Sequence, residues 1–200
     1  SSDRGAKLLS LDGALEHPFA AGRAVLCVAA LPDGVHFVAG LGSRQVRLYH
    51  VDGTLVHTFK GHTLNVRAVA VTPDGQHIIS GSFDKLVKVW SVASKSLVST
   101  CAGHSGHFGV CAVAAMPDGQ RFLSGGYDKT VRVWLLDGTL ENTFELHTGP
   151  VYAVVALSDN QHALSGSWDK TVKLFNVNDG AVLRTFKHHT RDVILSLIHI

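Results

Sequence analysis

Short runs in which apolar and polar residues alternate follow one another along the chain, separated by segments rich in turn residues. In residues 87–89 and 131–133 a basic side chain stands between two apolar ones. Alternation with a period of two is typical of half-buried β-strands rather than helices. Lys88, Arg132 and Lys173 then fall on the polar side of a strand, which we expect to be a solvated edge. One set of runs predicts four short strands at 65–71, 76–81, 86–91 and 96–102.

A six-residue motif recurs in phase with these runs. Its sequence is SGSFDK at 80–85, SGGYDK at 124–129 and SGSWDK at 165–170, so that its aspartates lie 44 and 41 residues apart. A Pro-Asp-Gly turn keeps the same phase: proline sets φ, aspartate bonds to the local backbone and glycine takes a positive φ. Each unit therefore predicts a small four-stranded sheet. Such a sheet cannot bury both faces alone, but several sheets stacked around an axis can.

The repeat length and the Gly-His … Trp signature, as in Gly61-His62 and Trp90, resemble the WD-repeat family. The resemblance covers nearly the whole chain. It implies an all-β WD-repeat β-propeller fragment, with four complete four-stranded antiparallel blades and a partial blade at each end. One blade is degenerate, because Ser43 replaces the turn aspartate and Tyr49 the tryptophan.

The phase of the repeat also sets the expected boundaries. They are 1–22 (end of a truncated blade), 23–60 (degenerate blade), 61–102, 103–145 and 146–187 (WD blades) and 188–200 (first strand of a further blade). Residues 195–200 lack the expected turn chemistry, and our hypothesis is that they are an artefactual tail from cloning or sequence assembly.

Each well-preserved unit also carries a histidine, a serine, an aspartate and an aromatic residue. A catalytic triad is needed once and must face a cleft, so repetition at the same phase favours a structural role. The family resemblance implies a hydrogen-bond chain from Trp to Ser to His to Asp. Phe175 has no N–H, so the third chain should be one bond shorter. The network residues are His62, Ser80, Asp84, Trp90, His104, Ser124, Asp128, Trp134, His147, Ser165 and Asp169.

The same resemblance implies a binding surface, here called the top face: the loops that precede each first strand and those that join second to third strands. The residue before each turn aspartate is aromatic in three successive units, and the loop at 105–109 is longer than its counterparts. Aromatic residues are typical of binding hot spots, although these rings could instead pack against their own loops. The expected partner-binding residues are Phe83, Tyr127, Trp168, Asn65, Arg67, Phe108, Cys111, Pro150 and Tyr152.

Composition narrows the class of function. The 200 residues are 46% hydrophobic and 17% charged with a net charge of +2, which fits a globular chain and disfavours nucleic-acid binding or membrane insertion. The three cysteines, Cys27, Cys101 and Cys111, have no metal-ligand spacing, and no phosphate-loop motif is present. We therefore expect no metal, no cofactor and no catalysis, in an intracellular protein that is cytoplasmic or nuclear.

Three functions are compatible with this pattern. The first is a non-catalytic scaffold or adaptor that binds proteins or peptides through the top face, within a multiprotein complex. The second is a substrate-recognition propeller of a larger regulatory protein or enzyme complex, such as a ubiquitin ligase or a signalling assembly. The third is an enzyme with a site in the propeller channel, which no unique acid, base or nucleophile supports. Fold alone does not choose among them.

Overall fold

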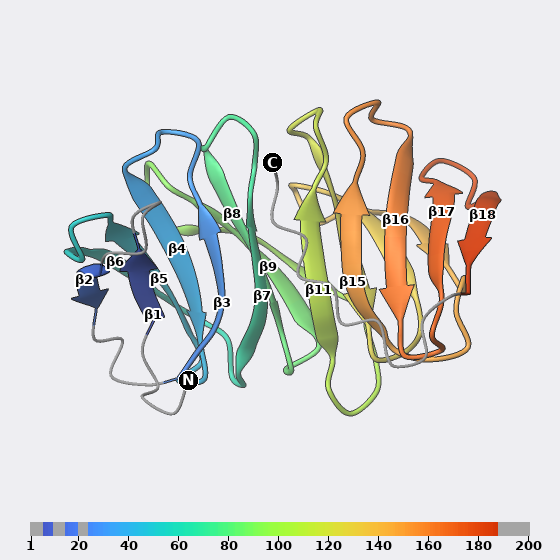
Figure 1. The fold of residues 1–200 in the computed structure, drawn as a ribbon, viewed down its shortest axis with the longest axis horizontal. Helices are drawn as coiled ribbons and strands as arrows, with labels where there is room; N and C mark the ends of the chain where they lie inside the picture. The colour runs from blue at the N-terminus through green and yellow to red at the C-terminus, as the bar shows by residue number, and fades with distance from the viewer. Residues whose placement is uncertain (1–5, 10–14, 20–23, 188–200) are drawn as a thin grey trace.

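Figure 1 shows the computed structural model, which describes residues 6–9, 15–19 and 24–187. Its described part consists of strands and turns without a helix. Four four-stranded sheets and one two-stranded sheet are present, and in each of them consecutive strands pair antiparallel. The predicted all-β propeller class is confirmed, with the four-stranded sheets side by side in an open arc.

Within each sheet, strands that are consecutive in the sequence lie next to one another. The two-stranded sheet contains β1 (Ala6–Leu9) and β2 (Leu15–Phe19). The first four-stranded sheet contains β3 (Val25–Ala30), β4 (His36–Leu41), β5 (Gln45–His50) and β6 (Leu55–Lys60). The second contains β7 (Val66–Val71), β8 (His77–Ser82), β9 (Leu86–Ser91) and β10 (Leu97–Ala102). The third contains β11 (Val110–Ala115), β12 (Arg121–Gly126), β13 (Val131–Leu135) and β14 (Leu140–Phe144). The fourth contains β15 (Val151–Ala156), β16 (His162–Ser167), β17 (Val172–Asn176) and β18 (Val182–Phe186).

These bounds lie within a residue of the four strands predicted for the second sheet. The division of the chain into blades stays a prediction. Its last unit, 188–200, and the tail at 195–200 fall outside the described residues, as does most of 1–22.

Three of the four hydrophobic clusters lie between neighbouring sheets, and the fourth consists of residues of the first sheet. One cluster joins Val38 and Val46 of the first sheet to Val66 and Ile78 of the second. Further clusters join the second sheet to the third and the third to the fourth in the same way. Each sheet is therefore stabilised by its neighbours, as the stacking argument predicts.

A glycine in the second strand of a sheet allows the next sheet to approach. A Cβ at Gly81 would lie 2.6 Å from Cγ1 of Val110, the residue that opens the first strand of the following sheet. No side chain fits in that space. The same contact occurs at each junction that the structure describes, in the pairs Gly40–Val66, Gly81–Val110 and Gly125–Val151.

The predicted turn chemistry is present at the loops that join first to second strands. Asp33 Oδ1 accepts hydrogen bonds from the N–H groups of Val35 and His36, both at 2.9 Å. Gly34 has a φ of 73°, a left-handed conformation that glycine adopts without strain. These loops, with those joining third to fourth strands, form what we call the turn face. It lies along the upper edge of Figure 1, and the top face lies along the lower edge.

The expectation that Lys88 belongs to a solvated edge is wrong. Its strand, β9, lies between β8 and β10, and the side chain is only 7% exposed. The Lys88 ammonium donates a hydrogen bond of 3.0 Å to Thr100 Oγ1 on β10. Lys173 similarly donates to the carbonyl oxygen of Leu146. The alternating pattern identified the polar side of the strand, but on that side Lys88 lies beside Thr100 of β10 and the loop at Gly61.

Candidate functional site

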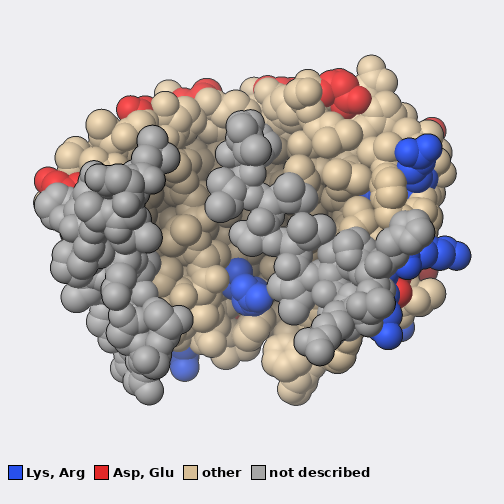
Figure 2. Space-filling view, viewed as in Figure 1, with Lys and Arg blue, Asp and Glu red and all other residues tan. Residues whose placement is uncertain are grey.

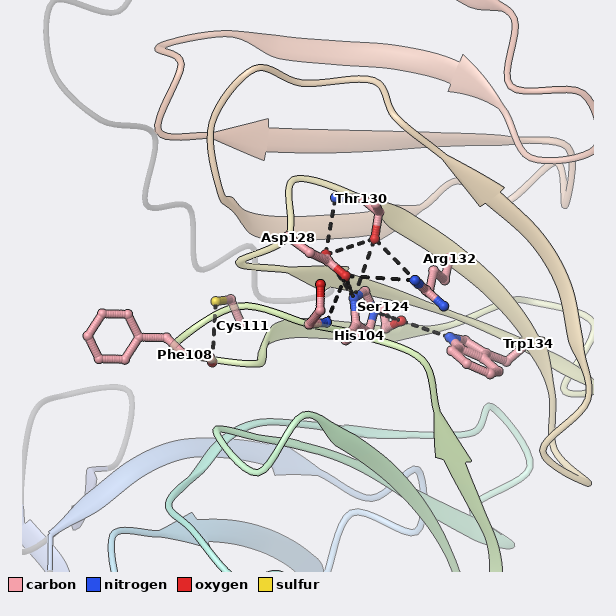
Figure 3. Close-up of polar contacts among 9 residues, drawn as sticks. His104, Phe108, Cys111, Ser124, Asp128, Thr130, Arg132 and Trp134 are labelled. Atoms are coloured by element: carbon pink, nitrogen blue, oxygen red, sulfur yellow. Dashed lines mark hydrogen bonds and ion pairs between the residues drawn. The ribbon is translucent and has the colours of Figure 1, made fainter.

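Figure 3 shows a chain of buried hydrogen bonds that crosses the third sheet. Trp134 Nε1 donates to Ser124 Oγ at 2.8 Å, and Ser124 Oγ lies 2.6 Å from His104 Nε2. His104 Nδ1 lies 3.0 Å from both oxygens of Asp128. The chain runs from β13 through β12 to the loops before β11 and before β13. It therefore ties two strands and two top-face loops into one unit.

The direction of each hydrogen bond follows from what each group can donate. The Asp128 carboxylate only accepts, so His104 Nδ1 carries the proton between them. Ser124 already accepts from Trp134, which leaves its hydroxyl proton for His104 Nε2. This assignment gives each buried polar side-chain atom of the network a hydrogen-bond partner.

The second and fourth sheets contain the same arrangement. In the second, Trp90 Nε1 and His62 Nε2 both lie 2.8 Å from Ser80 Oγ, and His62 Nδ1 lies 2.8 Å from Asp84 Oδ2. In the fourth sheet the corresponding bonds join His147 to Ser165 at 2.7 Å and His147 to Asp169 at 2.8 Å. Phe175 occupies the tryptophan position there and donates no hydrogen bond.

The environment of the aspartates favours their ionised form. Burial raises the pKa of Asp128, but hydrogen bonds from His104, Thr130 and the Ser105 N–H outweigh it and lower the pKa to about 2. The pKa values of the equivalent aspartates Asp84 and Asp169 are also lowered, by balances of the same kind.

The histidine of the fourth sheet responds to burial in the opposite sense. Burial lowers the pKa of His147, although Asp169 opposes that effect. The lowered pKa values of His147 and Asp169 together favour a neutral His147 beside a charged Asp169 carboxylate.

This geometry suits a structural network rather than a nucleophile. Ser80 and Ser124 have no exposed surface and Ser165 has 1%, so substrate has no access to their hydroxyl groups. Each serine hydroxyl is also held between two partners or against the histidine. A nucleophilic serine needs an open position beside an oxyanion site, and these serines have none.

The degenerate first sheet replaces the network with an aromatic stack. Ala39 occupies the serine position, and Tyr49 stacks on Phe37 with ring centroids 5.3 Å apart. Ser43, at the turn aspartate position, has a buried hydroxyl with no hydrogen-bond partner among the residues that the structure describes. The sequence indicated the loss of Asp and Trp here but not this substitute.

Sequence reasoning missed several members of the network. Thr130 Oγ1 donates to Asp128 at 2.8 Å, and Thr171 makes the same bond to Asp169 at 2.6 Å. Ser82 is wholly buried, and its hydroxyl accepts the Asp84 N–H at 3.1 Å. The signal was present, since these residues recur in phase with the aspartates. These residues stand beside the histidine, serine, aspartate and tryptophan positions on which the prediction was based.

A backbone hydrogen bond fixes each aromatic residue of the top face. The N–H of Phe83 bonds to the carbonyl oxygen of Asn65 at 3.0 Å. The N–H groups of Tyr127 and Trp168 bond at 2.9 Å to the carbonyls of Gly109 and Pro150. In every case the loop before the first strand anchors the loop before the third. The three aromatic side chains therefore start from equivalent, rigid positions.

The structure divides the expected aromatic arc into two groups. Phe108 lies between Phe83 and Tyr127, with centroid distances of 5.3 and 5.1 Å, and is itself 42% exposed. Trp168 is 47% exposed and contacts Tyr152 at 6.3 Å. We call these the Phe108 group and the Trp168 group. Half-buried Tyr127 packs against Phe108 of its own unit, as the alternative expected, whereas half-buried Phe83 packs against the same ring from the loop of the next unit.

The other predicted top-face residues differ in exposure. Asn65 and Arg67 are half-buried and reach the surface. Cys111 is only 5% exposed and Pro150 is buried, so their assignment to a binding surface is wrong. Both residues lie at the start of a first strand, Cys111 within β11 and Pro150 directly before β15.

The cysteines and acidic residues provide no metal site within the described residues. No group of three or more His, Cys, Asp or Glu side chains could hold an ion there. Cys27, Cys101 and Cys111 are free thiols, and burial raises their pKa values to about 12, 11 and 11. High pKa values leave these thiols protonated and unreactive at neutral pH. Residues 6–9, 15–19 and 24–187 also include no helix of the length and apolarity needed to cross a bilayer.

Comparison with known proteins agrees with this architecture. The profile of the family described as "WD domain, G-beta repeat" matches residues 53–91, 95–134 and 138–176. The solved structure of U3-55K is similar to this chain with a TM-score of 0.79 and 23% sequence identity, over 86% of this chain and 54% of that one. At this sequence identity the similarity concerns the fold alone. The chain spans about half the length of the U3-55K chain. No curated protein sequence gives a significant match.

The stacked four-stranded sheets define a β-propeller-type protein. The family matches extend over more than half of the chain, and the chain belongs to the WD-repeat family. Members of this family are in general protein-interaction modules and in general not catalysts.

Proposed function

We propose that this chain is a non-catalytic scaffold that binds protein partners through the top face. The observation that carries the proposal is the exposure of Phe108 and Trp168 on loops held by a rigid framework of strands and buried hydrogen bonds. Large aromatic side chains contribute strongly to protein interfaces, and holding them in place reduces the entropy lost on binding. A substrate-recognition role within a larger regulatory complex would use the same surface.

A pull-down with the full chain tests the proposal. We expect the double variant Phe108→Ala/Trp168→Ala to lose most partner recovery, because each substitution removes the exposed ring of one aromatic group. The matched control is Leu97→Ala/Leu140→Ala, which removes two exposed apolar side chains, 46% and 41% exposed, from the outer strands. Equal recovery of partners with both variants would refute the assignment of the top face.

We also propose an intracellular, reducing location. Three free cysteines with raised pKa values support it, since a chain exposed to oxidising conditions commonly pairs its thiols. Labelling of unfolded protein taken directly from cells with a thiol reagent should modify all three residues. If two of the cysteines react with the reagent only after treatment with a reductant, they form a disulfide and the proposal is contradicted.

A further inference from the structure

The two loop faces of this chain carry opposite exposed charge, although its net charge is close to zero. Acidic residues lie along the turn face, and they appear as the red atoms at the upper edge of Figure 2. They are Asp33, Asp52, Asp74, Asp118, Asp137, Asp159 and Asp179. Lys95 is the only lysine or arginine among the described residues of these loops, and Arg121, at an adjoining strand end, is paired with Asp118 at 2.8 Å. Histidines at other strand ends contact Asp33, Asp52 and Asp159.

The top face presents cations instead. Each loop that joins a second to a third strand has one basic residue at the same position, in a left-handed conformation with φ between 68° and 73°. All four side chains are exposed, and no ion pair is found for any of them within the described part. We call them the top-face cations: Arg44, Lys85, Lys129 and Lys170.

The acidic residue beside each of these lysines does not offset it at the surface. The side chains of Asp84, Asp128 and Asp169 are 4%, 8% and 10% exposed and turn inward to the buried histidines. A ligand on this face therefore meets the ammonium groups and not the carboxylates. Glu145, in the loop before β15, is the one exposed acid among the described residues of the top-face loops.

Cations and aromatic rings alternate along the top face because both belong to the same motif. Phe83 is followed two residues later by Lys85, Tyr127 by Lys129 and Trp168 by Lys170. Each such loop thus offers one apolar contact and one positive charge. A partner that satisfies both must carry carboxylates interspersed with apolar side chains.

We propose that the top face binds an acidic, partly apolar segment of a partner protein. This inference rests on the proposed function and names the chemical class of the partner. An acidic peptide fits better than single-stranded nucleic acid, because the rings of the Phe108 group pack against one another by their edges and faces. Stacking of successive bases needs separate, open ring faces.

A binding experiment with defined probes tests the partner class. The full chain is titrated with a fluorescein-labelled peptide of glutamate and leucine, and binding is followed by fluorescence anisotropy. Two alternative probes are used. One is a peptide in which lysine replaces glutamate, and the other is an oligouridylate with the same negative charge as the acidic peptide. We expect the acidic peptide to bind more tightly than either, and to weaken as ionic strength rises to about 0.15 M, where the Debye length is about 8 Å.

Two variants of equal charge locate the effect. Lys85→Gln/Lys129→Gln should weaken binding of the acidic peptide about five- to thirtyfold, as expected for the loss of two exposed charge contacts. Lys95→Gln/Arg184→Gln removes the same charge away from the top face and should leave binding within about twofold. Lys95 also has a positive φ, of 57°, so one of the control sites matches the backbone strain of the test sites.

Distinct outcomes separate this inference from the proposed function. Equal weakening by both variants, or tighter binding of the basic peptide, would overturn the acidic class. Tighter binding of oligouridylate, lost in the Lys85/Lys129 variant, would replace it with a nucleic-acid partner. If the basic peptide binds and Phe108→Ala/Trp168→Ala abolishes its binding, the top face stands as a binding surface while the acidic class fails.

Discussion

The contribution of Asp128 to the stability of the buried network can be estimated from its hydrogen bonds and from its pKa. Its side chain is 8% exposed and accepts hydrogen bonds from His104, Thr130 and the Ser105 N–H. Removing the carboxylate leaves these buried donors without an acceptor, which costs about 1–3 kcal/mol of stability. The pKa gives a second estimate: a shift from 3.8 to about 2 corresponds to about 2 kcal/mol of stability at pH 7.

We therefore expect Asp128→Asn to lower the free energy of unfolding by about 2 kcal/mol at pH 7. Urea denaturation followed by tryptophan fluorescence measures this difference. Asp179→Asn is the matched control, because Asp179 lies in an exposed turn and its carboxylate accepts the Ala181 N–H. Its denaturation midpoint should hardly change.

The pH dependence of the same variant tests the electrostatic part of the reasoning. The pKa of Asp128 is lower in the folded state, so the carboxylate stabilises the fold above the unfolded-state pKa of 3.8 and loses this effect as pH falls through about 2. The stability difference between wild type and Asp128→Asn should shrink by about half at pH 3. A difference that is absent at pH 7, or equal at both pH values, would refute the reasoning.

Three further changes probe other parts of the structure by the same denaturation assay. Trp134→Phe should cost about 1 kcal/mol, because Ser124 loses a donor while the shape stays close to that of the phenylalanine in the next sheet; an unchanged midpoint would argue against the bond. Gly81→Ala should cost about 1–3 kcal/mol, because its Cβ would collide with Val110; stabilisation instead would show that the junction is loose. Wild-type stability should fall as pH drops below 6.5, because burial lowers the pKa of His147 and the folded state disfavours its protonated form. The stability of His147→Gln should depend less steeply on pH, and an equal dependence would contradict this reasoning.

The sequence predicted the parts of the fold that depend on local chemistry and on repetition. Strand positions follow from alternation, and the Asp33-Gly34 turn follows from what each residue does to the backbone. Repetition also distinguished the His-Ser-Asp sets from a catalytic triad before any geometry was known. These features each depend on a few neighbouring residues, or on the same few residues seen several times.

Other features depend on contacts that the repeat does not specify. Lys88 is buried because Thr100 on β10 and the loop at Gly61 lie beside its side chain. The division of the aromatic residues into two groups arises because Phe108, on a loop longer than its counterparts, enters the space between Phe83 and Tyr127. Both depend on neighbouring elements whose relative position a linear pattern does not give.

The hydrogen-bond chains also bear on the order in which the molecule folds. Each links residues close in sequence, such as His62 and Asp84, which are 22 positions apart, and each is completed within one sheet and its own loops. Contacts between sheets join consecutive sheets of the chain. Low sequence separation favours early closure, so each sheet can form as a unit before it docks on its neighbour. Amide hydrogen exchange should then show protection that rises sheet by sheet. The backbone of the first sheet, which lacks the Trp-Ser-His-Asp hydrogen bonds, should open more readily than that of the second.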